Sequence, residues 1–171
     1  MLPVLSICLS VTALASSMQQ PSLLDMFRQK SSADCVLVGY QFSTVRSGIT
    51  LMGEGAVEIQ GNAYHMQGNE IEIFCDGSST WMIDGSAKEV IVENADSKEA
   101  GYLANPVLLL MNLENSGATC EVDGNRISVT LADGSPLEIV ITSLESVDTK
   151  KTEAFRPPTE FGSDWIVTDL R

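Results

Sequence analysis

Basic residues and histidine are scarce in this chain of 171 residues. Ten lysine and arginine residues stand against 23 aspartate and glutamate residues, which gives a formal net charge of −13 at pH 7. Nucleic acids and anionic membranes recruit proteins through clusters of lysine and arginine, and no such cluster occurs here. We therefore expect no nucleic-acid partner. The single histidine, His65, also excludes metal sites that need two histidines from one chain.

Signatures of the common catalytic sites are missing as well. His65 lies in a strand-like stretch without a Gly-x-Ser-x-Gly or Cys-His pattern nearby, so we interpret it as a partly exposed strand residue. Four aspartates are each followed by glycine, an arrangement typical of turns: Asp76, Asp84, Asp123 and Asp133. The sequence thus predicts no enzyme, no cofactor and no metal site. An enzyme that uses a pair of carboxylates remains an alternative.

The first 17 residues carry no charge and include an apolar run that ends at Ala13-Leu14-Ala15. An apolar stretch followed by small residues predicts a secretory signal peptide over residues 1–17, although the basic residue that usually precedes such a stretch is absent. A buried helix is the alternative, because the segment is too short to span a bilayer core of about 30 Å. The length of residues 18–171 predicts one exported, soluble domain.

Removal of the signal segment leaves three cysteines, so at most one disulfide can form within the chain. Cys75 and Cys120 each share one face of a strand-like stretch with apolar residues. They are therefore either small buried side chains or the two halves of a Cys75–Cys120 disulfide. The sequence leaves both interpretations open.

Apolar residues that alternate with polar ones, separated by turn-forming pairs, predict a protein made mainly of strands. The expected strands cover residues 35–42, 51–59, 63–67, 70–75, 80–83, 89–93, 119–122, 127–131, 137–144 and a terminal stretch within 164–170. Tight Gly-Asn and Asp-Gly turns link the five strands from 51 to 93 into an antiparallel meander. Gly53 and Gly55 predict a bend or bulge within one of these strands.

Two short helices are expected beside the strands. Ser22 and Asp25 have the spacing of a capping box, which predicts a helix over residues 21–30. Pro106 suits the first turn of a second helix, whose run from 105 to 113 is hydrophobic nearly all round and must be covered on several sides. This helix either closes an apolar ligand cavity like a lid or lies on an ordinary filled core. Periodicity alone does not separate the two.

Seven parts of the chain follow one another as in a known family. They comprise a strand that ends in Asp-Gly with a tryptophan a few residues later, a lid-like helix and a closing strand: Gly53–Ile59, Tyr64, Ile73–Asp84, Lys88–Val90, Asn105–Leu109, Phe155–Pro158 and Trp165–Leu170. In this order they resemble the LolA-like outer-membrane lipoprotein carriers, in the form of short members from Bacteroidota. The likeness covers most of residues 21–171. The arginine that latches the lid in typical carriers is replaced here by Gln60-Gly61-Asn62.

The resemblance implies a curled antiparallel sheet that forms a half-open β-barrel and is covered by short helices. The implied function is that of a periplasmic chaperone, which binds the acyl chains of lipoproteins in a hydrophobic cavity and carries them towards the outer membrane. The implied partners are lipidated proteins, an inner-membrane release complex and an outer-membrane receiver, and the chain is expected to be a monomer. A binding module for a free lipid or another apolar small molecule is the alternative on the same scaffold.

The resemblance implies that the acyl chains lie against apolar strand residues. Because side chains alternate between the two faces of a strand, only some of these residues point inward. The cavity candidates are Tyr40, Phe42, Val57, Ile59, Ile71, Ile73, Trp81, Ile83, Val90 and Val92. The residues expected on the lid side are Leu24, Phe27, Leu108, Leu109 and Met111.

Overall fold

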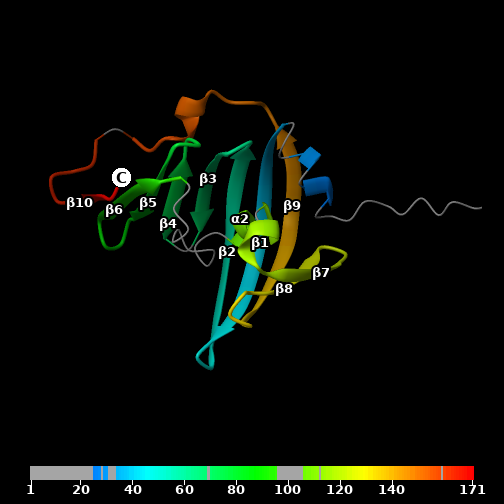
Figure 1. Cartoon of the computed structure of the whole chain (residues 1–171). Helices are drawn as coiled ribbons and strands as arrows, with labels where there is room; N and C mark the ends of the chain where they lie inside the picture. The colour runs from blue at the N-terminus through cyan, green and yellow to red at the C-terminus, as the bar shows by residue number, and fades with distance from the viewer. Residues whose placement is uncertain are drawn as a thin grey trace, which may run out of the picture.

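The computed structural model describes residues 25–27, 29–30, 34–68, 70–95, 106–111, 113–158 and 160–171. Strands dominate these residues, as the sequence predicts (Figure 1). The strands are β1 (Cys35–Arg46), β2 (Ile49–Gln60), β3 (Ala63–Gly68), β4 (Ile71–Cys75), β5 (Ser79–Asp84), β6 (Glu89–Asn94), β7 (Thr119–Asp123), β8 (Arg126–Thr130), β9 (Pro136–Val147) and β10 (Ile166–Asp169). The helices are α2 (Pro106–Met111), α3 (Leu113–Ser116) and the 3-10 helix η1 (Thr152–Phe155), and residues 25–27 and 29–30 are also helical. The predicted signal segment 1–17 lies outside the described residues.

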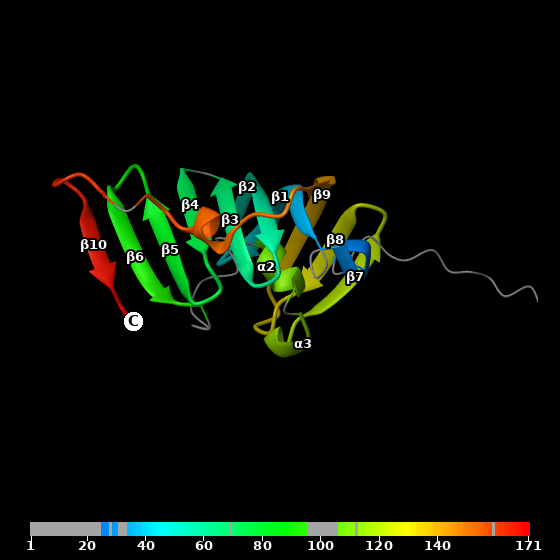
Figure 2. The ribbon, with the colours of Figure 1, turned by 90° about the horizontal axis from the view of Figure 1, so that it is seen from above.

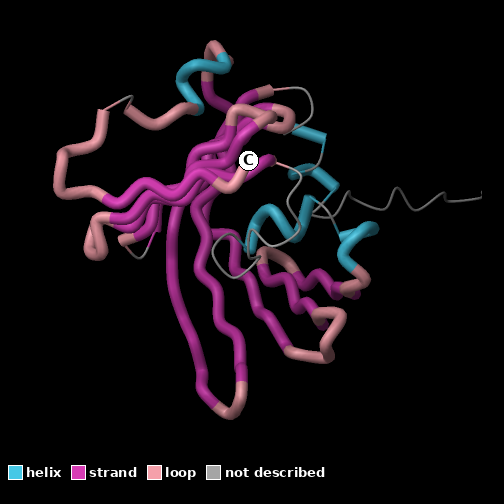
Figure 3. The backbone as a smooth tube through the Cα atoms, turned by 60° about the vertical axis from the view of Figure 1, so that its left-hand side comes forward, coloured by secondary structure: helices cyan, strands magenta, loops and turns pink. Residues whose placement is uncertain are grey.

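All ten strands form one sheet in the order β10-β6-β5-β4-β3-β2-β1-β9-β8-β7. The sheet bends around the helical segments, but its edge strands β10 and β7 do not pair with each other, so it stays open (Figures 2 and 3). The predicted meander is confirmed, because each strand from β1 to β6 pairs antiparallel with the next. β10 departs from the antiparallel pattern and runs parallel to β6. None of the helices in the described ranges is long and apolar enough to cross a membrane.

Of the bend or bulge predicted at Gly53 and Gly55, the bulge is wrong. The register of β1 with β2 is unbroken, and the shift of register lies instead between Gly39 and Tyr40, where β1 meets β9. Gly55 is needed for a close approach of strands. A Cβ atom at this position would lie 2.7 Å from the carbonyl oxygen of Gln67 and 2.8 Å from the hydroxyl of Tyr40, distances that real Cβ atoms do not adopt.

Side chains of directly paired residues point to the same face of a sheet, so the register assigns each strand residue to one of two faces. We call the face that α2 and α3 cover the helix face. The opposite face is crossed by residues 155–158 and 160–165, which we call the strap, and we name this face the strap face. The main core lies on the helix face. A smaller core on the strap face consists of Phe74, Trp81, Ile83, Val90, Val92, Phe161 and Trp165.

One buried carboxylate fixes the strap to the sheet. The Asp76 side chain, in the turn after β4, is 4% exposed and accepts hydrogen bonds from the backbone N–H groups of Ser78 and Ser79, both at 2.9 Å. Its second oxygen accepts a hydrogen bond from Arg156 Nε at 2.7 Å. Burial alone would raise the pKa of Asp76, but these donors outweigh it and hold the pKa below its ordinary value. The carboxylate is therefore charged and paired in the folded protein.

Replacing Asp76 with alanine should lower the free energy of unfolding by about 2–4 kcal/mol, because two backbone N–H groups and a guanidinium lose their acceptor. Asp84→Ala is the matched control. Asp84 accepts two similar backbone bonds, from Ser86 and Ala87, but lies in an exposed turn without an arginine, so its loss should have a clearly smaller effect. Urea unfolding at neutral pH measures both variants.

The contribution of Asp76 should also depend on pH. A carboxylate whose pKa is depressed by folding stabilises the folded state above its ordinary pKa of 3.8, and this stabilisation is lost as the pH falls through the folded pKa. The stability difference between the native protein and Asp76→Ala should therefore be constant from about pH 7 to pH 5 and shrink below about pH 4. If the Asp76 and Asp84 substitutions lowered the free energy of unfolding equally at neutral pH, Asp76 would not fix the strap to the sheet as described.

Candidate functional site

The helix α2 covers the helix face with apolar side chains alone. Its six residues, Pro-Val-Leu-Leu-Leu-Met, include no polar side chain, and it lies over β1 and β2 (Figures 1 and 2). Val107, Leu109 and Leu110 are completely buried. They belong to one core with an apolar floor that six strands supply: Val36, Val38, Tyr40, Val57, Ile59, Met66, Ile73, Ile127, Val129, Leu137 and Ile139.

The ten predicted cavity residues do not share one face. Six of them lie on the helix face: Tyr40, Phe42, Val57, Ile59, Ile71 and Ile73. The other four lie on the strap face: Trp81, Ile83, Val90 and Val92. The register explains the split, because Trp81 pairs with Phe74, whereas the next residue, Met82, pairs with Ile73. The four strap-face residues therefore cannot line a cavity under the helices.

The predicted lid residues that the structure describes lie on the helix face. Phe27 and Leu109 are buried in the main core, and Leu108 is half-buried beside it. Leu24 and the side chain of Met111 lie outside the described part of the chain. The leucines of α2 occupy the concave side of the sheet. This packing is compatible with both interpretations that the sequence left open, a closed lid and a helix on a filled core.

The cavity and lid residues predicted from the sequence omit several fully buried residues of this face, among them Met66 and Leu110. Met66 on β3 stands in register between Val57 and Ile73, which were both among the cavity candidates. The tight turn between β2 and β3 fixes this register. Counting residue pairs from that turn along β2 and β3 would have placed Met66 opposite Val57 from the sequence alone.

The polar groups buried on the helix face are uncharged at neutral pH. Burial raises the pKa of Tyr40 to about 12. Burial also raises the pKa of Tyr64, as does the neighbouring thiol of Cys75, whose own pKa is raised by burial. Tyr64, Cys75 and Thr80 lie side by side in one cross-strand row. This face therefore suits an uncharged, apolar ligand.

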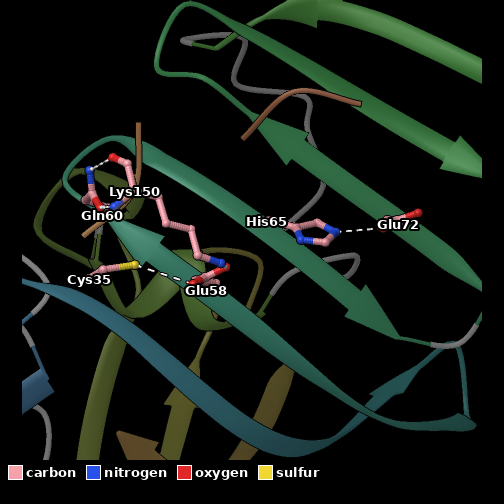
Figure 4. Close-up of polar contacts among 6 residues, drawn as sticks. All are labelled: Cys35, Glu58, Gln60, His65, Glu72 and Lys150. Atoms are coloured by element: carbon pink, nitrogen blue, oxygen red, sulfur yellow. Dashed lines mark hydrogen bonds and ion pairs between the residues drawn. The ribbon is translucent and has the colours of Figure 1, made fainter. Parts of the chain in front are cut away.

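Charged groups gather on the strap face instead (Figure 4). One carboxylate oxygen of Glu58 accepts a bond from Lys150 Nζ at 2.6 Å, and the other accepts one from the Cys35 thiol at 3.6 Å. Burial and the charge of Glu58 raise the pKa of Cys35 to about 11, so the thiol stays protonated and is a poor nucleophile. His65 Nε2 lies 2.7 Å from Glu72 Oε1, and His65 is partly exposed on its strand, as predicted.

Cys35, Cys75 and Cys120 are free thiols in the described part of the chain. Cys75 lies on β4 and Cys120 on β7, and five strands separate these two in the sheet. Apolar surroundings on the same face do not bring the two thiols together across so many strands. The predicted Cys75–Cys120 disulfide is not formed in this structure, and the Cys75 thiol donates to the carbonyl oxygen of Asn62 at 3.6 Å.

Comparisons with known proteins bear on the fold alone. No protein-family model matches the chain, and no curated protein matches it in sequence. Among solved structures, an uncharacterized conserved protein from Thermus thermophilus is similar, with a TM-score of 0.50 and 5% sequence identity over 85% of this chain and 96% of that chain. A likeness at this identity supports the architecture of the sheet and carries no information on a ligand.

Under native conditions, Cys120 should react with iodoacetamide well before Cys35 and Cys75. Cys120 is partly exposed, whereas the other two thiols are buried and have raised pKa values. Peptide mapping by mass spectrometry after timed alkylation of the unreduced protein measures each thiol separately. Recovery of Cys75 and Cys120 in one linked peptide would show that the disulfide forms after all.

Proposed function

We propose that this chain is a periplasmic carrier of lipoproteins, which binds their acyl chains on the helix face of the sheet. The observation that supports the proposal is the packing of α2. This helix has no polar side chain and covers an apolar, uncharged face of the sheet. Apolar contact is not directional, so another apolar body of similar size can replace the helix. In this proposal α2 occupies the place that acyl chains take when cargo is bound.

The free energies of the two occupants are similar. Burial of one apolar side chain contributes about 1.5–3 kcal/mol, so Val107, Leu109 and Leu110 together contribute about 5–9 kcal/mol to the seating of α2. An acyl chain contributes about 0.8 kcal/mol per buried methylene, and a chain of about 16 carbons therefore contributes about 12 kcal/mol. One acyl chain can thus displace α2 with a small net gain. A small net gain suits a carrier, because the cargo has to be released again.

The chain departs from the LolA-like carriers at the position of the lid latch, and this departure bears on how readily α2 opens. In this chain Gln60 stands in the stretch that replaces the latch arginine. Its side-chain amide donates to the backbone carbonyl of Lys150 at 2.9 Å and accepts from the backbone N–H of Lys150 at 2.7 Å. Gln60 therefore ties β2 to the segment after β9 and not to α2. We expect α2 to open more readily than a latched lid.

The native tryptophans do not report on this site, because Trp81 and Trp165 lie on the strap face. Calorimetric titration avoids the need for a reporter. A diacylated lipopeptide is the probe, and the same peptide without acyl chains and palmitate are the comparison ligands. Tight binding of the lipopeptide, with weak binding of both comparison ligands, is the expected result for a lipoprotein carrier.

Leu109→Ala should destabilise the empty protein by about 2–4 kcal/mol and yet bind the lipopeptide at least ten-fold more tightly, because the closed helix competes with the cargo. Val92→Ala is the matched control. Val92 is also buried, but on the strap face, so its truncation should lower stability without changing the affinity for lipopeptide. Urea unfolding and calorimetric titration measure the two quantities.

The remaining outcomes separate the alternatives. Equal affinity for palmitate and lipopeptide would favour a carrier of free lipid. Absence of binding by both the native protein and Leu109→Ala would overturn the proposal and leave α2 as a fixed helix of the core.

A further inference from the structure

The strand β10 forms one edge of the sheet and is exposed along its whole length. Among the described strands it pairs with β6 alone, and Ile166, Val167 and Leu170 are 60%, 53% and 61% exposed. The backbone N–H of Ile166 donates to the carbonyl of Lys88 at 2.9 Å, and that of Leu170 donates to the carbonyl of Val92 at 2.8 Å. Because N–H groups alternate along a strand, those of Val167 and Asp169 point away from β6. These groups are placed to pair with a further strand.

The opposite edge of the sheet is protected in a way that β10 is not. The outward side chains of β7 are polar or charged, with Thr119, Glu121 and Asp123 exposed and the residues between them turned inward. Charged side chains on an edge strand oppose pairing with another chain. β10 instead exposes two adjacent apolar side chains, Ile166 and Val167. The edge at β10 is therefore the one that favours an added strand.

A hollow of about 580 Å³ opens beside β10 on the strap face. Its lining combines an apolar floor with a charged rim: Trp81, Val90, Val92, Glu160, Phe161, Gly162, Val167, Asp169 and Arg171. Arg171 holds the pKa of Asp169 at about 2 through hydrogen bonds to both carboxylate oxygens, so this pair is neutral overall. Glu160 leaves the rim with a net negative charge.

We propose that β10 and the hollow beside it bind an extended, basic segment of another protein, which pairs with β10 as an eleventh strand. Main-chain hydrogen bonds to Val167 and Asp169 would supply the pairing, as in other cases of strand addition. A lysine or arginine of the segment would lay its stem on Trp81 and Val167 and place its charged head at Glu160. This site lies on the strap face and is separate from the proposed acyl-binding site on the helix face.

The negative charge of the chain favours a basic partner over a second copy of the same chain. The chain carries a net charge of −13, which attracts a basic segment and repels a second copy of the same chain. Edge pairing of two copies would bring two Glu160 side chains together, whereas Asp164 and Asp169 are paired with Lys88 and Arg171. A basic segment of a different protein therefore fits this edge better than self-association does.

Two synthetic peptides test the proposal. The first is a capped octapeptide that alternates lysine with valine, and the second replaces each lysine with glutamate. The fluorescence of Trp81, which lines the hollow, should change saturably with the lysine peptide, at an affinity at least ten-fold above that of the glutamate peptide. Amide exchange of Val167 and Asp169 in the native chain should slow when the lysine peptide is added. That exchange measurement requires no variant.

Variants separate the backbone pairing from the charged rim. Val167→Pro removes an outward N–H group without removing a hydrogen bond to β6. It should lower the affinity for the lysine peptide at least ten-fold. Glu160→Gln should lower the affinity for the lysine peptide about three-fold, whereas Glu121→Gln on the far edge strand β7 should leave this affinity unchanged.

Three results would overturn the proposal: equal affinity for the two peptides, no slowing of exchange at Val167 and Asp169, or a self-association of the native chain that Val167→Pro abolishes. The last result would assign the edge to a second copy. Failure of lipopeptide binding in the experiments on the helix face would leave this proposal intact, because the two sites lie on opposite faces.

Discussion

Apolar side chains stand on both faces of the central strands, so neither face of the sheet can be left in water. On β4, Ile73 points to the helix face and Phe74 to the strap face, and both are buried. A sheet of this kind needs a cover on each side. Two separate regions of the chain supply the covers: the helices that precede β7, and the strap that follows β9. The parallel pairing of β10 with β6 follows from the second cover, because the strap ends at the far edge of the sheet.

The two covers are held by different forces. The ion pair between Arg156 and the buried Asp76 ties the strap to the sheet with defined geometry, and Lys88 and Asp164 form a second pair that is exposed. The side chains of α2 offer only apolar contact. Breaking a buried ion pair leaves an uncompensated charge, whereas an apolar contact can be exchanged for another of similar area. In the proposed carrier, the helix side is therefore the one that would yield to acyl chains, and the strap side would keep the sheet intact.

The strands and hairpins were predictable from the sequence, but the face of the sheet to which each side chain points was not. Turn residues such as Gly61-Asn62 predict the hairpins correctly, because tight turns have local requirements. Trp81 and Ile73 are equally apolar, but their opposite directions depend on a register that involves three strands. The Asp76–Arg156 pair joins residues 80 positions apart, so no local pattern signals it. The need for glycine at position 55 likewise arises from Tyr40 on the neighbouring strand.

The scarcity of basic residues connects the two proposed sites. Six of the ten lysines and arginines are already paired with acids in the described ranges, which leaves most of the 23 acidic residues unneutralised and the exterior negative. Uncharged acyl chains are insensitive to this field, whereas a basic segment at β10 is attracted by it. The two ligands thus differ in the force that recognises them and bind on opposite faces. A partner that docks at β10 as proposed would leave α2 accessible, and it would therefore hold the protein in place while acyl chains enter or leave the helix face.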